Sequence, residues 1–539
     1  MKKPSYLPAG CRETAPYLLL VLAVFAAYAN VYHAAFLLDD HPLITDNKFL
    51  RDWKHIPDIL TNMNYAGAGL EGGNYRPVTT LLHLVLFQMF GLSKPAFHSL
   101  NVVLQAINAM LVYRLGRKLG FTAGAVFSAT LLWCVHPLST LVVTMVSSIP
   151  ELLWTTFILS GLLALLPDFT PRRICLALLF FLLALGSKET AIVFPALAVA
   201  CLFVTSKDRL NPAIYIKTWP FWLISAVDAL IWMHSIKTFM FNPQDLAVDP
   251  NLYALNPVNR ILTFLATMPA YFSLIIWPTG LHFPRSFPVF SSIFSWQVLA
   301  GAVMVAGAAA QIILGKGKRG LPLSFGFFWF AAALSPLSGI LLSIDAIFCE
   351  GWMYVPTIGL ALGVAQTLAV RINSLKSRQV QIITATIIAT AALAFGVKTN
   401  LQNEVYDTPG AFFENSLRCG DDLPDTHNNL GVYYLSVNEF DKAIEQLKLV
   451  VVRPGIRPPP MMAGLYVNLA IAYLRIPTDE NGLSTLQGLS GSLPHTHQIP
   501  EAVDALNKAL EIQPDLDWAH RFLNVIHDYQ QKQKNGEIQ

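Results

Sequence analysis

Long apolar segments constrain this chain more than any other feature of its sequence. A helix needs about 20 mostly apolar residues to cross a bilayer, and eleven segments approach or reach that length. They lie at 17–38, 97–113, 121–138, 140–166, 173–186, 190–205, 219–236, 297–314, 322–344, 354–371 and 379–397. Only 13% of the residues are charged, against roughly 25% in soluble domains. This composition excludes a soluble enzyme, a disordered protein and a disulfide-stapled secreted domain, and it predicts an all-α, polytopic membrane protein.

Basic residues predict how these helices are oriented, because Lys and Arg collect on the cytoplasmic side of membrane proteins. Five basic clusters separate or follow the predicted spans, at 114–118, 172–173, 207–217, 316–319 and 371–378. All five are cytoplasmic if the N-terminus is cytoplasmic and if two further apolar stretches, 77–90 and 261–278, are re-entrant or interfacial. The segments then predicted to lie outside are 39–96, 237–296, 345–353 and everything after 397.

The last part of the chain has a different character, because its composition becomes polar from about 398. Several of its residues have the spacing of a tetratricopeptide repeat, namely Leu430, Gly431, Tyr434, Ala443 and Leu447. We predict a membrane domain at 1–397, a linker helix at 398–423 and a short repeat domain at 424–539, with an insertion near 477–500. Such repeats form a concave groove for peptides. Generic helical hairpins are the alternative interpretation.

Charged residues near the outer ends of the predicted spans are the candidate functional groups, because charges are costly at membrane depth. Asp39 and Asp40 directly follow the first predicted span. One of them could act as a general base while the other orients or tunes it. A solvated pair of carboxylates at a helix end is the alternative. No cofactor is predicted, since neither metal-ligand spacing nor a CxxC pair occurs; a divalent metal is a possible but unsupported addition.

Polar and aromatic residues that could line a donor or acceptor pocket fall on the same predicted side of the membrane. They are His41, Tyr75, His98, Asn101, His136, Glu151, Glu189, Glu350 and Tyr354. Each alone has a structural alternative, such as a hydrogen-bonding histidine or a buried partner for a neighbouring helix. Together they suit a lipid phosphate and a polar acceptor. The net charge of +3 gives no reason to expect a nucleic acid.

The order of motifs along the chain carries a family resemblance. The motifs are Leu-Asp-Asp-His-Pro at 38–42, Asn-Tyr-Arg-Pro at 74–77, Phe-His-Ser-Leu-Asn at 97–101, His-Pro at 136–137, Pro-Glu-Leu-Leu at 150–153, Ser-Lys-Glu at 187–189, Asn-Pro-Val-Asn-Arg at 256–260 and Trp-Met-Tyr-Val-Pro at 352–356. Followed by repeats, this order resembles the transmembrane O-mannosyltransferase family with C-terminal tetratricopeptide repeats, within the GT-C glycosyltransferases. Two departures point to a bacterial relative: Ser148-Ile149-Pro150 replaces an expected alanine-arginine lead before Glu151, and the repeat domain is short.

The resemblance implies a helical membrane domain of GT-C type that uses a polyprenyl-phosphate sugar donor. It further implies an acidic outer loop that activates a protein hydroxyl, transfer at the periplasmic face of the inner membrane, and repeats that recruit the exported acceptor. Cations would offset the charge of the leaving lipid phosphate. The candidates are Arg76, Lys188, Arg260 and Arg285. A transferase acting on a glycan or a lipid, a non-catalytic membrane scaffold or assembly factor, and a transporter are the alternatives.

Overall fold

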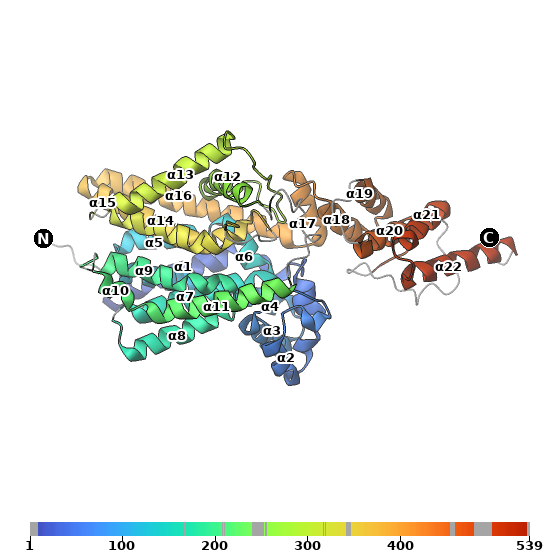
Figure 1. Ribbon diagram of the computed structural model, residues 1–539. Helices are drawn as coiled ribbons and strands as arrows, with labels where there is room; N and C mark the ends of the chain where they lie inside the picture. Colours follow the sequence, from blue (N-terminus) through green and yellow to red (C-terminus); the bar gives the residue numbers. More distant parts are fainter. Residues whose placement is uncertain are drawn as a thin grey trace. The chain divides into compact units, whose positions relative to one another are not determined.

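The chain forms two compact units (Figure 1). The first holds residues up to 241, 257–281 and 288–407, and the second holds 242–256, 282–287 and 408–539. The computed structural model describes residues 9–166, 168–206, 208–209, 211–239, 253, 256–315, 317, 320–340, 346–452, 459–478 and 498–535. All regular elements in these ranges are helices, which confirms the predicted all-α fold class.

The first unit is a bundle of apolar helices, and each predicted apolar segment contains one main helix. These helices are α1 (Ala9–Ala27), α4 (Lys94–Lys118), α5 (Ala123–Cys134), α7 (Ile149–Leu165), α8 (Pro171–Leu185), α9 (Phe194–Thr205), α11 (Trp219–Phe239), α13 (Trp296–Leu314), α14 (Leu321–Leu334), α15 (Tyr354–Ser374) and α16 (Arg378–Asn403). In the described part of the chain, six helices are long and apolar enough to cross a membrane, or seven if a bent pair at 123–144 is one span. The protein is therefore a multi-pass membrane protein, while the count of eleven crossings stays a prediction.

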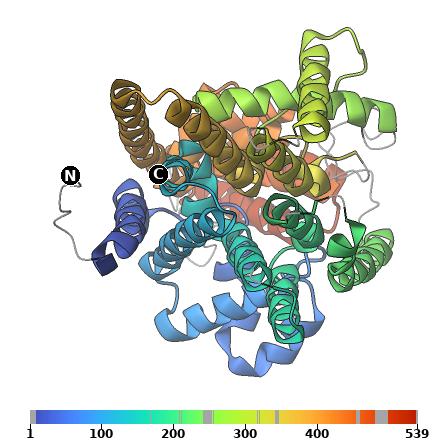
Figure 2. The same cartoon turned by 90° about the vertical axis from the view of Figure 1, so that its left-hand side faces the viewer.

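Two helices, α3 (Pro77–Phe90) and α12 (Pro257–Ile276), cover the stretches predicted not to cross. α3 has only 14 residues, fewer than a span needs. α12 has 20 residues and is apolar enough to cross. It is seen end-on in Figure 1, where α7, α8 and α11 run lengthwise, and it runs across the view in Figure 2. This crosswise direction supports an interfacial helix, which stays a prediction.

Helix starts in the bundle follow from proline in the sequence. Proline lacks a backbone N–H group, and its fixed φ suits a helix. It is favoured in the first turn, because N–H groups there have no acceptor within the helix and the missing group costs nothing. Pro77, Pro150 and Pro171 occupy the first turns of α3, α7 and α8. At the other end, α3 stops at Gly91, whose φ of 59° is easy only for glycine. These starts and stops set the turns that carry the charged residues described below.

The end of α1 differs from the sequence prediction. The apolar segment extends to residue 38, but α1 ends at Ala27 and a short 3₁₀ helix, η1 (Val31–His33), follows it. The expectation that Asp39 directly follows the first helix is therefore wrong. A loop holds Asp39 instead, and what fixes that loop becomes part of the site.

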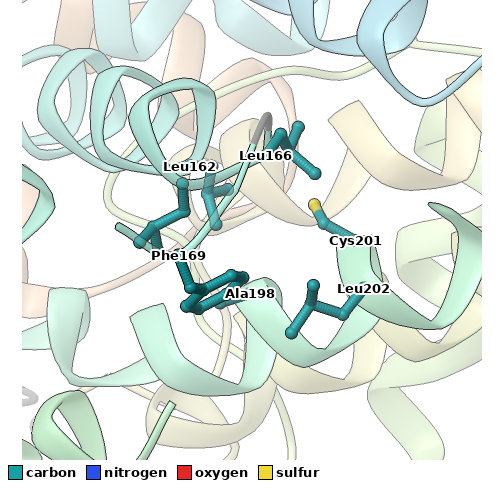
Figure 3. Close-up of a pocket in the computed structure, with 7 residues that line it drawn as sticks. Leu162, Leu166, Phe169, Ala198, Cys201 and Leu202 are labelled. Atoms are coloured by element: carbon teal, nitrogen blue, oxygen red, sulfur yellow. The ribbon is translucent and has the colours of Figure 1, made fainter. Parts of the chain in front are cut away.

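A small apolar pocket lies between α7 and α9 (Figure 3). None of its lining residues belongs to the loop that holds Asp39 and Asp40, which we call the acidic loop. Its walls include Leu162, Phe169, Ala198 and Cys201, and its volume is about 10 Å³. That volume is at the lower limit for one water molecule, and a water also needs polar partners. The lining is apolar apart from the Cys201 thiol, so we interpret the pocket as a packing gap.

The second unit is a series of helices that includes the predicted repeats. They are α17 (Pro409–Arg418), α18 (Pro424–Ser436), α19 (Phe440–Val452), α20 (Pro459–Tyr473), α21 (Ile499–Ile512) and α22 (Asp517–Lys534). The repeat residues Leu430, Ala443 and Leu447 are buried in its core. Gly431 lets α18 approach α19, because a Cβ at this position would lie 2.7 Å from the Leu447 side chain. Most of the predicted insertion lies outside the described residues, and the repeat assignment and the domain limits stay predictions.

Candidate active site

The N-terminus of α3 is docked on the turn that follows α8, and this contact gathers the charged residues. The backbone N–H of Val78 donates to the Gly186 carbonyl at 2.9 Å, and the Thr79 hydroxyl donates to the Ser187 carbonyl at 3.2 Å. A Cβ on Gly186 would lie 2.7 Å from a Val78 methyl group. Only a residue without a side chain permits so close an approach. Arg76, which precedes α3, thereby lies beside Lys188 and Glu189.

Arg76 forms a two-point ion pair with Glu189. Its Nε donates to Glu189 Oε2 at 3.1 Å and its Nη2 donates to Oε1 at 2.7 Å. A guanidinium has five N–H donors, and this pair uses two of them. Within the described residues, Nη1 of Arg76 makes no hydrogen bond. That edge of the guanidinium is free to receive another anion.

Lys188 forms a second ion pair, with Glu151, which is buried. The two side chains are in direct contact, and Lys188 and Glu151 are only 8% and 7% exposed. The other oxygen of Glu151 accepts from the Trp154 indole N–H at 2.5 Å. Glu151 lies in the first turn of α7, where the helix dipole favours a carboxylate. Lys188 is thus neutralised by a fixed partner, unlike a free phosphate-binding cation.

Asp39 is the accessible member of the acidic pair. It follows Leu38, whose φ of 49° is in the left-handed region, which costs energy for a residue with a side chain and often marks functional loops. The Asp39 side chain is exposed at the surface and accepts a hydrogen bond from Tyr65. The surrounding protein removes water from part of the Asp39 carboxyl, and this desolvation raises its pKa. The hydrogen bond from Tyr65 and the positive charge of Arg76 partly oppose that rise. A carboxylate so placed can accept a proton from a bound hydroxyl.

Asp40 has a different environment, being 0% exposed. It accepts the backbone N–H of Leu37 at 2.8 Å and that of Ser147 at 2.5 Å. Ser147 belongs to η7 (Val146–Ser148), immediately before the helix that carries Glu151. Burial raises the pKa of Asp40 to about 7, despite these hydrogen bonds. Asp40 therefore fastens the acidic loop to the start of α7.

A cavity of about 920 Å³ lies beside these charged residues. One wall is apolar and comes from α8 and α11, including Leu182, Leu185, Leu223 and Val227. The polar wall residues are Thr61, Asn74, Tyr75, Glu189 and Asp228. Arg76 lies between the wall residues Tyr75 and Pro77, and its partner Glu189 is itself part of the wall. The cavity therefore combines a long apolar side with an ion pair at one place on its wall.

The acidic loop is connected to this cavity through Tyr65. Gly73, which lines the cavity, has a φ of 84°, and a Cβ there would lie 3.0 Å from the Tyr65 ring. Tyr65 in turn donates to Asp39. The base candidate and the cavity are thus separated by one aromatic side chain.

Four predicted pocket residues make contacts that hold helices together. His98 donates to the Ala34 carbonyl at 3.1 Å, and Asn101 donates to the Met145 carbonyl at 3.1 Å. His136 donates to the Ile275 carbonyl of α12 at 3.0 Å. The Tyr354 hydroxyl donates to Gln105 and accepts from Asn108. These contacts place the four residues in the scaffold around the site, and their roles in binding stay predictions.

The remaining predicted residues are dispersed. Tyr75 is exposed on the cavity wall and donates to the Leu60 carbonyl at 2.8 Å. His41 lies 3.2 Å from the Thr45 hydroxyl, and Glu350 is buried at the start of a 3₁₀ helix. Nε of Arg260 has no hydrogen-bond partner within the described residues. Arg285 belongs to the second unit.

Three residues of the site were missed by the sequence analysis. Tyr65 and Trp154 carry no signal in the sequence, because each acts through a partner that only the fold supplies. Asp228 did carry one, since it is an acid in the middle of the predicted span 219–236, and ionisable residues inside membranes are functional candidates by default. Over the described residues, no group of three or more His, Cys, Asp or Glu side chains could hold a metal ion.

Comparison with known proteins gives relatives of one kind. The chain is 23% identical over 491 residues to protein O-mannosyl-transferase TMTC3 of Mus musculus, covering 84% of this chain and 52% of the relative. It is 23% identical over 363 residues to a protein O-mannosyl-transferase of Caenorhabditis elegans, covering 64% of this chain and 50% of the relative. The predicted resemblance is confirmed. The chain spans about half the length of these curated relatives.

A third relative and a solved structure complete the comparison. The protein O-mannosyl-transferase Tmtc1 of Drosophila melanogaster is 24% identical over 363 residues, covering 61% of this chain and 41% of the relative. The oligosaccharyltransferase of Archaeoglobus fulgidus, solved with a tethered acceptor peptide, has a TM-score of 0.41 and 13% identity, covering 81% of this chain and 59% of that one. A TM-score below 0.5 does not establish a shared fold. No family model matches the chain.

Proposed function

We propose that this protein is an integral-membrane glycosyltransferase that moves a sugar from a polyprenyl-phosphate donor to a Ser or Thr hydroxyl of an exported protein. The observation that carries the proposal is the cavity of about 920 Å³ beside α8 and α11. Its apolar wall suits a prenyl chain, and the Arg76–Glu189 pair on its margin suits a phosphate. The relatives named protein O-mannosyl-transferases support the same class of reaction.

The reaction needs a base, an electrophile and a stabilised leaving group. In our proposal, the acceptor hydroxyl oxygen attacks the anomeric carbon of the sugar while Asp39 takes its proton. The bond from that carbon to the phosphate oxygen breaks, and its electron pair stays on the polyprenyl phosphate. Nη1 of Arg76 faces the departing charge while Glu189 holds the opposite edge of the guanidinium. Charge-assisted donors placed in this way stabilise the developing anion.

Asp39 is the better candidate for the base because it is exposed, whereas Asp40 is fully buried and occupied by two backbone N–H groups. In this proposal Asp40 is a positioning residue. Leu38 and Tyr65 fix the direction of the Asp39 side chain. A base that is already oriented loses little entropy on reaching its reactive geometry.

We propose that the acidic loop and the C-terminal repeats lie on the periplasmic side of a bacterial inner membrane, where exported acceptors are found. An odd number of crossings follows from the positions of the basic clusters. A tag at the C-terminal end of the chain should therefore react with an impermeant reagent in intact cells or spheroplasts. A tag at the N-terminus should react only after the membrane is broken. A C-terminal tag that is protected in intact spheroplasts would contradict this orientation.

Arg76 provides a direct test of phosphate binding. We expect Arg76→Ala to weaken binding of undecaprenyl phosphate by about tenfold to a hundredfold, because hydrogen bonds to charged groups contribute about 1.5–3 kcal/mol each. Affinity is measured by titrating the lipid into the purified protein in nanodiscs. Lys54 serves as the control, since it is an exposed cation of the same outer segment, and Lys54→Ala should bind the lipid as wild type does. Unchanged affinity in Arg76→Ala would assign Arg76 a purely structural role beside Glu189.

The proposed activity is tested on intact exported proteins. Masses of exported proteins are compared between a strain that makes the protein and a deletion strain, and a hexose-sized shift lost on deletion supports transfer to protein. The purified chain with undecaprenyl-phosphate mannose or glucose and a Ser/Thr peptide should then reproduce the shift. Sugar found only on a glycan or lipid would support the alternative acceptor, and no transferred sugar in any fraction would support a scaffold.

A further inference from the structure

Among the described residues, Asp228 is the one charged wall residue that the proposed reaction does not use. It lies in α11, and its neighbours on the cavity wall are apolar: Leu223, Ile224, Val227 and Ile231. Within the described residues, Asp228 makes no hydrogen bond and no ion pair. The carboxylate of Glu189, which lines the same cavity, repels it. A carboxylate in an apolar helix is costly unless something bound in the cavity satisfies it.

The packing of α11 places Asp228 at the level of the ion pair. The Ser225 hydroxyl donates to the Ile192 carbonyl at 2.9 Å, which fixes α11 against η8 (Glu189–Val193). Asp228 follows Ser225 by three residues, and Glu189 precedes Ile192 by three. Asp228 and Glu189 are thus each about one helical turn from the Ser225–Ile192 contact, and both line the same cavity. Asp228 therefore lies beside the end of the cavity where a phosphate would bind.

A polyprenyl-phosphate sugar has three parts, the prenyl chain, the phosphate and the sugar, which differ in whether they can donate a hydrogen bond to the Asp228 carboxylate. The prenyl chain has no polar atom to offer. The phosphate is an anion without a hydrogen-bond donor, so Asp228 would repel it. The sugar is rich in hydroxyl groups, and an ionised carboxylate accepts hydrogen bonds at both of its oxygens. The sugar is the only part of the donor that complements Asp228.

We propose that Asp228 is a specificity-determining residue, which accepts hydrogen bonds from hydroxyl groups of the donor sugar. The inference rests on the proposed function and adds the part of the site that recognises the sugar. A site built to bind a particular hydroxyl discriminates strongly against a ligand that lacks it, because its buried polar group is then left unpaired. Asp228 would therefore distinguish epimers of the donor hexose.

The test compares one lipid with and without its sugar. The full-length protein in nanodiscs is titrated with undecaprenyl phosphate, undecaprenyl-phosphate mannose and undecaprenyl-phosphate glucose. We expect wild type to bind one of the two hexosyl lipids more tightly than the bare lipid. Asp228→Ala should bind that hexosyl lipid about tenfold to a hundredfold more weakly and the bare lipid at least as tightly as wild type does, because the variant has lost a charge that repels the phosphate. Asp228→Asn should be intermediate, because the amide keeps one acceptor oxygen.

Two controls make the comparison specific. Glu71 is exposed and does not line the cavity, so Glu71→Gln removes a charge of the same sign without changing either affinity. Val227→Ala removes an apolar contact from the same wall and should weaken all three lipids by the same factor. Undiminished binding of the bare lipid to Asp228→Ala shows that this variant is folded.

Three results would overturn the inference. Equal weakening of the bare and hexosyl lipids by Asp228→Ala would mean that the residue supports the cavity. Equal tightening would mean that it only repels the phosphate. A wild type that binds the hexosyl lipids no better than the bare lipid would mean that no side chain here recognises the sugar. Failure of the proposed function is seen separately, as absence of sugar transfer by the wild-type chain.

Discussion

Asp39→Asn is expected to lower the rate of sugar transfer by about 10²- to 10⁴-fold, the usual contribution of a positioned general base. Asparagine has nearly the same shape as aspartate but cannot take the proton of the acceptor hydroxyl. Donor binding should persist, because removing a negative charge near a phosphate does not weaken its attraction to Arg76. The measurement is the initial rate of peptide glycosylation by purified protein with a synthetic donor, together with donor affinity.

The matched control for this variant is Asp40→Asn, which removes the adjacent charge from a residue that is fully buried. Asp40 accepts two backbone N–H groups, and the amide group of asparagine can accept only at its single oxygen. We expect this variant to be less stable but to keep transfer within about tenfold of wild type. Near-wild-type transfer by Asp39→Asn would contradict the assignment and leave Glu151 and Glu350 as the acids to test.

The pH dependence of the transfer rate is a second test of the roles of Asp39 and Asp40. Because the pKa of Asp39 is raised by its surroundings, the rate should rise with pH through an apparent pKa above the ordinary range of aspartate. Adjacent acids titrate together, so this value belongs to the pair. Asp39 ionises first, and its negative charge is one cause of the raised pKa of Asp40, about 7. Asp40 is therefore uncharged while Asp39 titrates, and Asp40→Asn should leave the acidic limb of the profile close to its wild-type position.

The raised pKa of Asp40 also affects folding. A carboxyl whose pKa is higher in the folded state favours folding when it is protonated, and this contribution is lost as the pH rises through the folded value. For Asp40 the loss falls between the ordinary aspartate pKa, 3.8, and about 7. Asp40 accordingly costs the folded state less free energy below neutral pH than above it.

The sequence predicts the all-helical membrane fold well because hydropathy is a local property. Each apolar segment predicts its own helix from its own residues. The orientation that the basic clusters indicate stays a prediction. The resemblance to protein O-mannosyl-transferases likewise depends on the order of short motifs along the chain. The predicted end of α1 was wrong, because the mostly buried apolar sequence between Tyr28 and Leu38 forms turns and a short 3₁₀ helix and does not continue the α-helix.

The pairing of charges could not be predicted from the sequence. Arg76 and Glu189 are 113 residues apart, and Lys188 and Glu151 are 37 apart. Whether a cation is free or already neutralised depends on how α3 docks on the turn after α8. Lys188 and Arg76 therefore look equivalent in the sequence, while the structure gives one of them a buried partner and the other an unused donor edge. Asp228 differs from these residues, because its position as an acid within the predicted span 219–236 can be read directly from the sequence.

The buried pair of Lys188 and Glu151 gives the second large effect, on stability. Lys188→Met is expected to lower the free energy of unfolding by about 3–5 kcal/mol, because it leaves the carboxylate of Glu151 buried without a cation. The double variant Lys188→Met with Glu151→Gln should recover most of this loss. The uncharged glutamine still accepts the Trp154 indole N–H, which Glu151 accepts in the native chain, and methionine fills the volume of the lysine stem. Unfolding in mixed micelles, followed by tryptophan fluorescence, measures all three proteins.

The double variant also decides between the two roles of Lys188. If Lys188 is structural, as its 8% exposure and its contact with Glu151 indicate, the double variant should bind undecaprenyl phosphate within about threefold of wild type. If Lys188 is released from Glu151 to bind the donor, the double variant should be stable but should bind the lipid as weakly as Arg76→Ala does. Stability and affinity respond differently under these two roles, because the first depends on pairing buried charges and the second on keeping a cation available. Recovered stability with lost affinity would restore Lys188 to the phosphate site predicted from the sequence.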